Sequence, residues 1–188
     1  MKIEPVSFYV PGLPISQGSK RHVGGGRMIE SSKKLAPWRT LVAQVAYEAM
    51  EERQMFTAEP VWMAAKFVFW RPASHYRTGK FSDHLKPSAP EAPMTYPDTE
   101  KLVRAVNDAI EGIVFRNDSM VARLYAEKAY GETPGALVVI GPLREPMPGR
   151  LLDASDGDIH QAAAVLRMVA TRLKTPRPRT EERGSPEE

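Results

Sequence analysis

The chain contains no cysteine, so disulfide bonds and thiolate metal sites are excluded, and the composition fits a reducing interior. No apolar run approaches the ~18 residues that a membrane-spanning helix needs. The N-terminal segment lacks the charged and apolar regions of a signal peptide. The four histidines show no metal-ligand spacing, which argues against zinc. We therefore expect a cytoplasmic protein with no membrane association.

Positive charge is concentrated in two segments. Residues 16–40 contain six Lys or Arg and one acid, and residues 66–86 contain five and one, although the net charge is only +3. The remainder of the chain is therefore slightly acidic. Two basic segments on such a background indicate a face that binds a polyanion, or else two solvated loops rich in lysine.

Periodicity predicts an α+β domain, and a hydrophobic fraction of 42% is enough to form its core. A Gly24–Gly26 turn predicts a hairpin tip, and Pro37 marks the start of a helix that extends to about Met50. A second helix is expected from Asp98 or Thr99 to about Gly112. Strands are expected at residues 2–10, 61–70, 121–130 and 136–140.

Two other segments differ from this pattern. Residues 71–97 carry five prolines and predict a long irregular loop, which in compact domains is usually functional or disordered. The core domain is expected to span residues 1–143. The extension, residues 144–188, predicts an amphipathic helix at about 156–174 and a disordered charged tail.

Three acids, Asp98, Glu100 and Asp118, lie at the expected helix start and in the turn before the following strand. We expect them to converge, and clustered carboxylates repel one another unless a divalent cation lies between them. Such a site in a basic protein suggests metal-assisted cleavage of a phosphodiester backbone. Each acid also has an ordinary explanation, as a helix cap, a first-turn acid or a turn residue.

Basic side chains accompany these acids on the polar side of the helix. Arg104 lies one turn after Glu100 and one turn before Asp108, so it can bridge both carboxylates. Its guanidinium is also suited to contact a scissile phosphate. The alternative is a ladder of charge pairs on a solvated helix face.

The segment 97–121, PDTEKLVRAVNDAIEGIVFRNDSMV, resembles the central motif of the RusA family of Holliday junction resolvases. The resemblance extends over about residues 3–140 and includes Pro11-Gly12-Leu13-Pro14 and the LKPSAP segment at 85–90. It implies a two-layer sandwich in which a small mixed β-sheet packs against two helices. The positions that match the motif are Pro97, Asp98, Leu102, Ala105, Asp108, Ala109, Ile110 and Asp118.

The resemblance implies a homodimeric endodeoxyribonuclease that resolves four-way DNA junctions by paired nicks and needs no small-molecule cofactor. It implies that Asp98, Glu100 and Asp118 bind Mg²⁺, for which Mn²⁺ would substitute. Arg104 would take the place of the family lysine near the phosphate.

Branched DNA would then follow the basic segments. Tyr96, Trp70 and Phe81 are candidates to stack on an opened base, although core packing is the favoured interpretation for Trp70. The candidates for contact with DNA phosphates are Lys20, Arg21, Lys33, Lys34, Arg71, Arg77, Lys80, Lys86 and Lys101.

The chain departs from the family pattern at four positions. Glu100 replaces an aspartate, Lys101 an asparagine, Arg104 a lysine and Asn117 an aspartate. Two alternatives to the nuclease hypothesis therefore stand. One is a junction-binding protein with weakened or lost catalysis. The other is an adaptor that binds a partner through the C-terminal helix.

Overall fold

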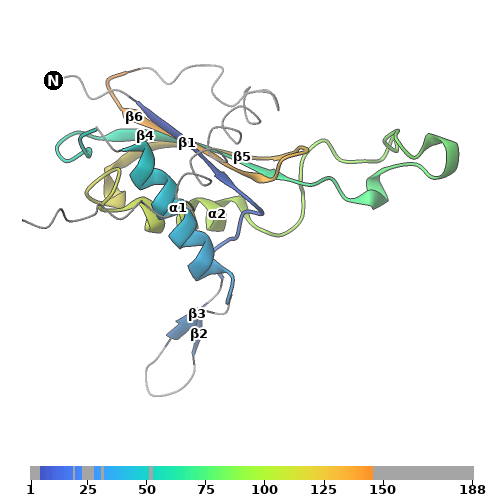
Figure 1. Ribbon diagram of the computed structural model, residues 1–188, viewed down its shortest axis with the longest axis horizontal. Helices are drawn as coiled ribbons and strands as arrows, with labels where there is room; N and C mark the ends of the chain where they lie inside the picture. The colour runs from blue at the N-terminus through green and yellow to red at the C-terminus, as the bar shows by residue number, and fades with distance from the viewer. Residues whose placement is uncertain (1–4, 19, 23–27, 31, 51–52, 146–188) are drawn as a thin grey trace, which may run out of the picture.

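The computed structural model describes residues 5–18, 20–22, 28–30, 32–50 and 53–145. One layer of the domain is a four-stranded sheet of spatial order β1-β6-β4-β5 (Figure 1). The strand β6 runs antiparallel to β1 and β4, whereas β4 and β5 are parallel. This mixed sheet confirms the fold that the resemblance implies. Its strands are β1 (Val6–Pro11), β4 (Val61–Phe69), β5 (Val121–Tyr130) and β6 (Gly135–Pro142).

Two helices, α1 (Leu35–Ala49) and α2 (Thr99–Ile110), form the second layer (Figure 1). The apolar stripe predicted for α2 is buried in the core that the two helices share with the sheet. Full burial of one such side chain contributes about 1.5–3 kcal/mol, so this stripe fixes α2 on the sheet. The largest fully buried core side chains on the helix-covered face include Phe56, Phe67, Phe115, Leu35, Met63, Leu102 and Ile110.

The first helix begins slightly earlier than the sequence predicts. It starts at Leu35, so Pro37 is the third helical residue rather than the first. A proline is still accepted there because the first four N–H groups of a helix have no partner within it. In β4 the residues of both faces are buried, whereas the residues of β5, at the edge of the sheet, are half-buried or exposed.

Parallel neighbours require a crossover connection. The chain leaves the C-terminal end of β4, passes through residues 71–97, returns along α2 and then enters β5. The helix therefore runs antiparallel to both strands. One consequence is that the two ends of α2 lie at opposite ends of the sheet.

Residues 71–97, which we call the arm, extend away from the sheet (Figure 1). The arm is not wholly irregular, because it contains two 3-10 turns, Ala73–His75 and Gly79–Phe81. Its two legs are joined by backbone hydrogen bonds, from Arg77 N to His84 O at 2.9 Å and from Lys86 N to His75 O at 2.8 Å.

A short antiparallel hairpin of β2 (Lys20–His22) and β3 (Met28–Glu30) agrees with the predicted glycine turn, although residues 23–27 lie outside the described part. The predicted C-terminal helix at 156–174 also lies outside it. Within the described residues, no helix is both long and apolar enough to cross a membrane.

Candidate functional site

Asp98 occupies the N-cap position of α2, with the extended backbone typical of that position. Its side chain nevertheless makes no capping hydrogen bond. The carboxylate instead contacts Lys101 Nζ at 2.7 Å, and the two side chains are 56% and 40% exposed. A cap residue that leaves the helix N–H groups free points its oxygens outward, where they are available to a ligand.

The electrostatic setting keeps this carboxylate ionised. The hydrogen bond and the positive charge of Lys101, with a smaller contribution from Lys128, lower the pKa of Asp98. The same pair raises the pKa of Lys101. At neutral pH the start of α2 therefore presents a charged carboxylate beside a charged ammonium group.

Glu100 lies in the first turn of α2 and pairs with Arg104 at 3.1 Å. This i, i+4 contact was predicted, but the bridge from Arg104 to Asp108 was not observed. Asp108 is instead bonded to Arg39 of α1, so this ion pair joins the two helices. The side chain of Arg104 is 58% exposed, and its partner within the described part of the chain is Glu100, whose side chain is 82% exposed. Both groups are therefore accessible to DNA.

Lys128 of β5 holds the backbone that leads into α2. Its Nζ donates to Thr95 O at 2.8 Å and to Pro97 O at 3.0 Å, the carbonyls just before Asp98. The sequence analysis missed this residue. A signal was present, because Lys128 lies between Ala126 and Tyr130 on the face of β5 that packs toward the core, where a lysine needs polar partners.

The segment after β1 also packs against this point. Ser16, which is 1% exposed, donates its hydroxyl hydrogen to Tyr96 Oη at 2.8 Å, and Gln17 N donates to Lys101 O at 3.0 Å. Two separate segments, residues 16–17 and strand β5, thus fix the backbone around Asp98. Such support is what a precisely placed ligand requires.

The third predicted acid lies elsewhere. Asp118 is exposed in a 3-10 turn, Asp118–Met120, which directly precedes β5 and so follows the opposite end of α2. A helix of 12 residues spans about 18 Å. The expected convergence of Asp98, Glu100 and Asp118 therefore does not occur within one chain, because the crossover between parallel strands separates them. Among the described residues, no three acidic or histidine side chains form a group able to hold a metal ion.

Two carboxylates still suit a hard cation. Magnesium is usually bound by one or two protein carboxylates, with water and substrate phosphate completing its shell. Asp98 and Glu100 are both exposed oxygen donors at the positive end of a helix, and each is neutralised only by a partly exposed base. The chemistry of these two side chains therefore fits a divalent ion whose other ligands come from outside the chain.

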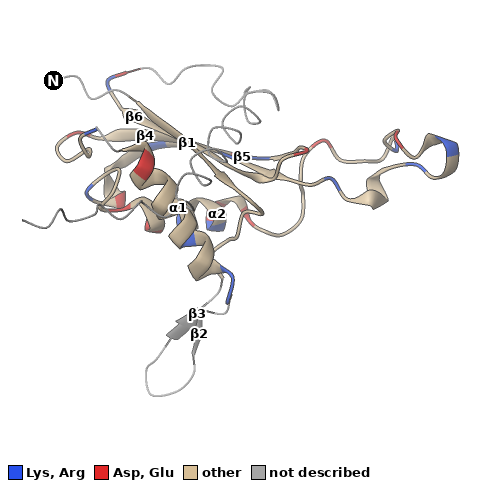
Figure 2. Cartoon of the chain, in the orientation of Figure 1, with Lys and Arg blue, Asp and Glu red and all other residues tan. Residues whose placement is uncertain are grey.

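The remaining candidates for DNA contact occupy two regions (Figure 2). Lys33 and Lys34 are exposed just before α1, and Arg77, Lys80 and Lys86 are exposed on the arm. Some of the predicted cations already have intramolecular partners, such as Lys86, whose Nζ donates to Ser74 O at 2.8 Å. The side chains of Lys20 and Arg21 lie outside the described part.

Arg71 has the most extensive set of such contacts. It donates to Pro90 O at 2.7 Å and to Glu91 O at 3.3 Å, and its guanidinium carbon lies 4.3 Å from the centre of the Tyr130 ring. These bonds tie the two legs of the arm together at its base. Arg71 therefore has a structural role whether or not it contacts DNA.

A comparison with known protein families identifies the domain that carries these residues. A family model described as endodeoxyribonuclease RusA matches residues 11–141. The chain belongs to the RusA family. This match confirms the resemblance and includes the whole of α2, the arm and β5. RusA proteins are Holliday junction resolvase endonucleases that bind branched DNA, and resolvase nucleases generally use divalent metal ions.

A relative in Bacillus subtilis (strain 168), named uncharacterized protein YqaN, is 28% identical over 137 residues. The aligned region covers 72% of this chain and 94% of that relative. A stretch that covers 72% of a chain of 188 residues necessarily includes the arm and Asp98.

Proposed function

We propose that this protein is a Mg²⁺-dependent, structure-selective endodeoxyribonuclease that nicks four-way DNA junctions as a homodimer. The main observation in support is the state of Asp98 in a chain of the RusA family. Its carboxylate occupies a cap position without capping, is more than half exposed and has a lowered pKa. An acid held in this way is suited to bind a cation rather than to stabilise the helix.

In this proposal Asp98 and Glu100 hold Mg²⁺ at the start of α2. The ion would supply charge stabilisation of the scissile phosphate and an activated water at neutral pH. Lys128 keeps the backbone before Asp98 in place through its two carbonyl contacts. The fold therefore orients the ligands before DNA arrives.

The bases beside these acids have a second role. Without an ion, Lys101 neutralises Asp98 and Arg104 neutralises Glu100. Once the carboxylates bind a cation, both bases become free to pair with a DNA phosphate. Arg104 presents a planar group that can contact two phosphate oxygens, which places it near the charge that develops during cleavage. Contacts from Lys33, Lys34 and the arm would position the DNA backbone.

The position of Asp118 supports the homodimer in this proposal. This exposed acid cannot reach the Asp98 of its own chain, because α2 separates the two. If Asp118 contributes to the metal site, it does so from a second copy. In a symmetric dimer two such sites form at once, which agrees with paired nicks.

The runner-up is a junction-binding protein with little catalytic activity. Asn117, the residue before Asp118, supports it, because its amide donates to Glu111 at 3.1 Å and its oxygen accepts from Ser119 N. A residue engaged in this way shapes the turn instead of binding a metal ion. The adaptor alternative requires the residues after 145. If the domain of residues 1–143 acts alone as a nuclease, truncation after Glu145 should leave junction cutting intact.

The test is cleavage of a labelled four-way junction in Mg²⁺ by the unsubstituted protein, by Asp98→Asn and by Glu48→Gln as a control on α1. We expect symmetrical nicks that Asp98→Asn reduces at least about a hundredfold, because a metal ligand contributes several kcal/mol to catalysis. Binding without nicks by the unsubstituted protein would favour the runner-up. Failure to bind the junction would overturn both.

A further inference from the structure

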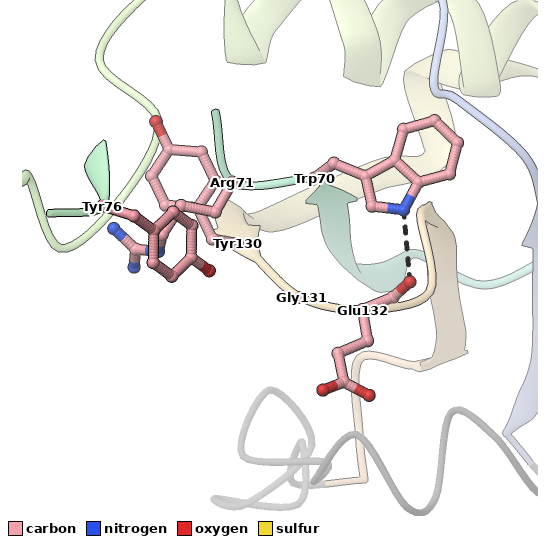
Figure 3. A pocket seen from close by; sticks show the side chains of 6 residues that line it. All are labelled: Trp70, Arg71, Tyr76, Tyr130, Gly131 and Glu132. Atoms are coloured by element: carbon pink, nitrogen blue, oxygen red, sulfur yellow. Dashed lines mark hydrogen bonds between the residues drawn. The ribbon is translucent and has the colours of Figure 1, made fainter. Parts of the chain in front are cut away.

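A pocket of about 300 Å³ lies where the arm leaves the sheet (Figure 3). It is lined by residues from the end of β4, the arm and the end of β5. Most of these are flat side chains. The lining residues are Trp70, Arg71, Tyr76, Tyr130, Gly131 and Glu132.

The pocket walls are fixed and open. The indole of Trp70 is 63% exposed, and its Nε1 donates to Glu132 O at 3.2 Å (Figure 3). Figure 3 shows the Trp70 ring on one side, with Arg71 and the rings of Tyr76 and Tyr130 on the other. Tyr130 is held between the Arg71 guanidinium and the edge of His75, whose ring centre is 5.5 Å away. These rings therefore cannot close over the pocket without breaking several contacts.

The pocket lies close to the proposed metal site. Tyr130 follows Lys128 by two residues on the same face of β5, a step of about 7 Å along the strand. Lys128 contacts the carbonyl of Pro97, the residue before Asp98. A DNA strand whose phosphate lies at Asp98 could therefore reach the pocket within about one or two nucleotides.

We propose that this pocket binds one unstacked nucleobase of the junction, between the ring of Trp70 and the rings of Tyr76 and Tyr130. The inference rests on the proposed function, because it assumes that DNA lies at the start of α2. Single-stranded bases are bound mainly by stacking on aromatic rings and on arginine planes. The volume is at the lower limit for small-ligand sites, which suits one flat ring system. The positive charge of Arg71 favours the phosphate next to such a base.

Recognition should be tolerant of base identity. In Figure 3 the carboxylate of Glu132 points away from the aromatic side chains, and only its backbone oxygen meets the indole. Stacking accepts every base because each has an aromatic face. We therefore expect the pocket to select for an opened base at a branch point and not for a sequence.

The experiment removes the base and the pocket separately. Junctions that carry a single abasic nucleotide at successive positions around the crossover are titrated with Asp98→Asn protein and with Asp98→Asn/Trp70→Ala protein. We expect one position at which loss of the base weakens binding at least about fivefold to the first protein. At that position the Trp70→Ala protein should show no further loss.

Two controls make the result specific. Trp70→Phe keeps an aromatic face and should retain most of the abasic effect, whereas Tyr47→Ala removes a 72% exposed ring on α1 and should change nothing. Trp70→Ala should also leave the salt dependence of binding unchanged, since it removes no phosphate contact. Equal abasic effects with and without Trp70 would overturn the pocket but not the nuclease. Absence of junction binding by the Asp98→Asn and the unsubstituted protein would overturn both.

Discussion

At the N-terminal end of α2, Asp98 and Glu100 each pair with a basic side chain. Lys128 holds the preceding backbone through two hydrogen bonds to carbonyl groups. Beyond the C-terminal end, Asp118 lies in an exposed turn whose neighbour, Asn117, bonds Glu111 and Ser119. The N-terminal end of α2 thus carries paired opposite charges on a backbone that is held by hydrogen bonds from another strand. The other end carries an exposed acid in a self-contained turn.

Asp98 and Asp118 are close in sequence, but this does not place them in one site. Between Asp98 and Asp118 the chain runs the whole length of α2. In the proposed function, the N-terminal end holds a cation together with DNA, whereas Asp118 at the opposite end contributes a ligand only to the site of a second copy. If the two ends act together, they do so between subunits, and the N-terminal end then depends on the contacts of Lys128.

The largest effect is expected from mixing two inactive variants. Asp98→Asn and Asp118→Asn should each lose nicking activity at least about a hundredfold, because each removes a ligand of the proposed metal site. Dimers formed from an equal mixture should regain about a quarter of the activity, since half are mixed and each mixed dimer has one intact site. The nicks should then fall on one strand at a time.

The matched control mixes Asp98→Asn with Glu100→Gln. Both changes affect the same end of α2, so a mixed dimer has no intact site and activity should stay low. Recovery in the first mixture alone would show that the two ends meet between subunits. If Asp118→Asn by itself retains full activity, Asp118 is not a ligand and the comparison between the two ends loses its functional meaning.

A smaller effect is expected from Lys128→Met, which keeps the length of the side chain but removes its two hydrogen bonds. Groups that orient metal ligands typically contribute 10- to 100-fold, so we expect a loss of about that size at low Mg²⁺. Raising the Mg²⁺ concentration should restore part of the rate, because the ligands remain present. Junction binding without Mg²⁺ should change little.

Lys66→Met is the control on the neighbouring strand, because Lys66 is a strand lysine that pairs with Glu127 at 3.4 Å and lies away from Asp98. If both variants lose activity equally, Lys128 has no special positioning role. A loss for Lys128→Met that is independent of Mg²⁺ would also contradict that role.

Much of the fold could be predicted from periodicity. The apolar stripe on α2 and the apolar run of β4 could be identified because residues that form a core must be apolar, and both are buried. The family resemblance was also visible, since the motif around Asp98 is local in sequence. Trp70 shows the limit of such reasoning, because core packing was the favoured interpretation for it and was wrong: the side chain is 63% exposed.

What the sequence could not give is the direction of the chain between motifs. The acids of α2 and of the following turn can be brought together or held apart, depending on whether β4 and β5 are parallel, and spacing alone does not decide this. The partners of Lys128 and Arg71 are backbone carbonyls. Because every residue has one, these partners cannot be identified from residue types. The site residues therefore remain predictions, although the helix that carries them is confirmed.

The smallest effect concerns stability and acts only at the N-terminal end of α2. Because the pKa of Asp98 is lowered in the folded protein, its ion pair contributes stability above the ordinary carboxylate pKa of about 3.9. That contribution is lost as the pH falls through the lower, folded-state value. The gap in Tm between the unsubstituted protein and Asp98→Asn should therefore narrow below about pH 4.

A double-mutant cycle separates this pair from the effect of Asp98 on the helix dipole. The coupling between Asp98→Asn and Lys101→Met should be present at neutral pH and should vanish in acid. Because the pKa of Lys101 is raised, the coupling should also decline as the pH rises through the folded-state value of the lysine, above about 10.4. A coupling that persists in acid would mean that the two side chains interact by packing, and the N-terminal end would then lose the reversible ion pair that distinguishes it from the Asp118 end.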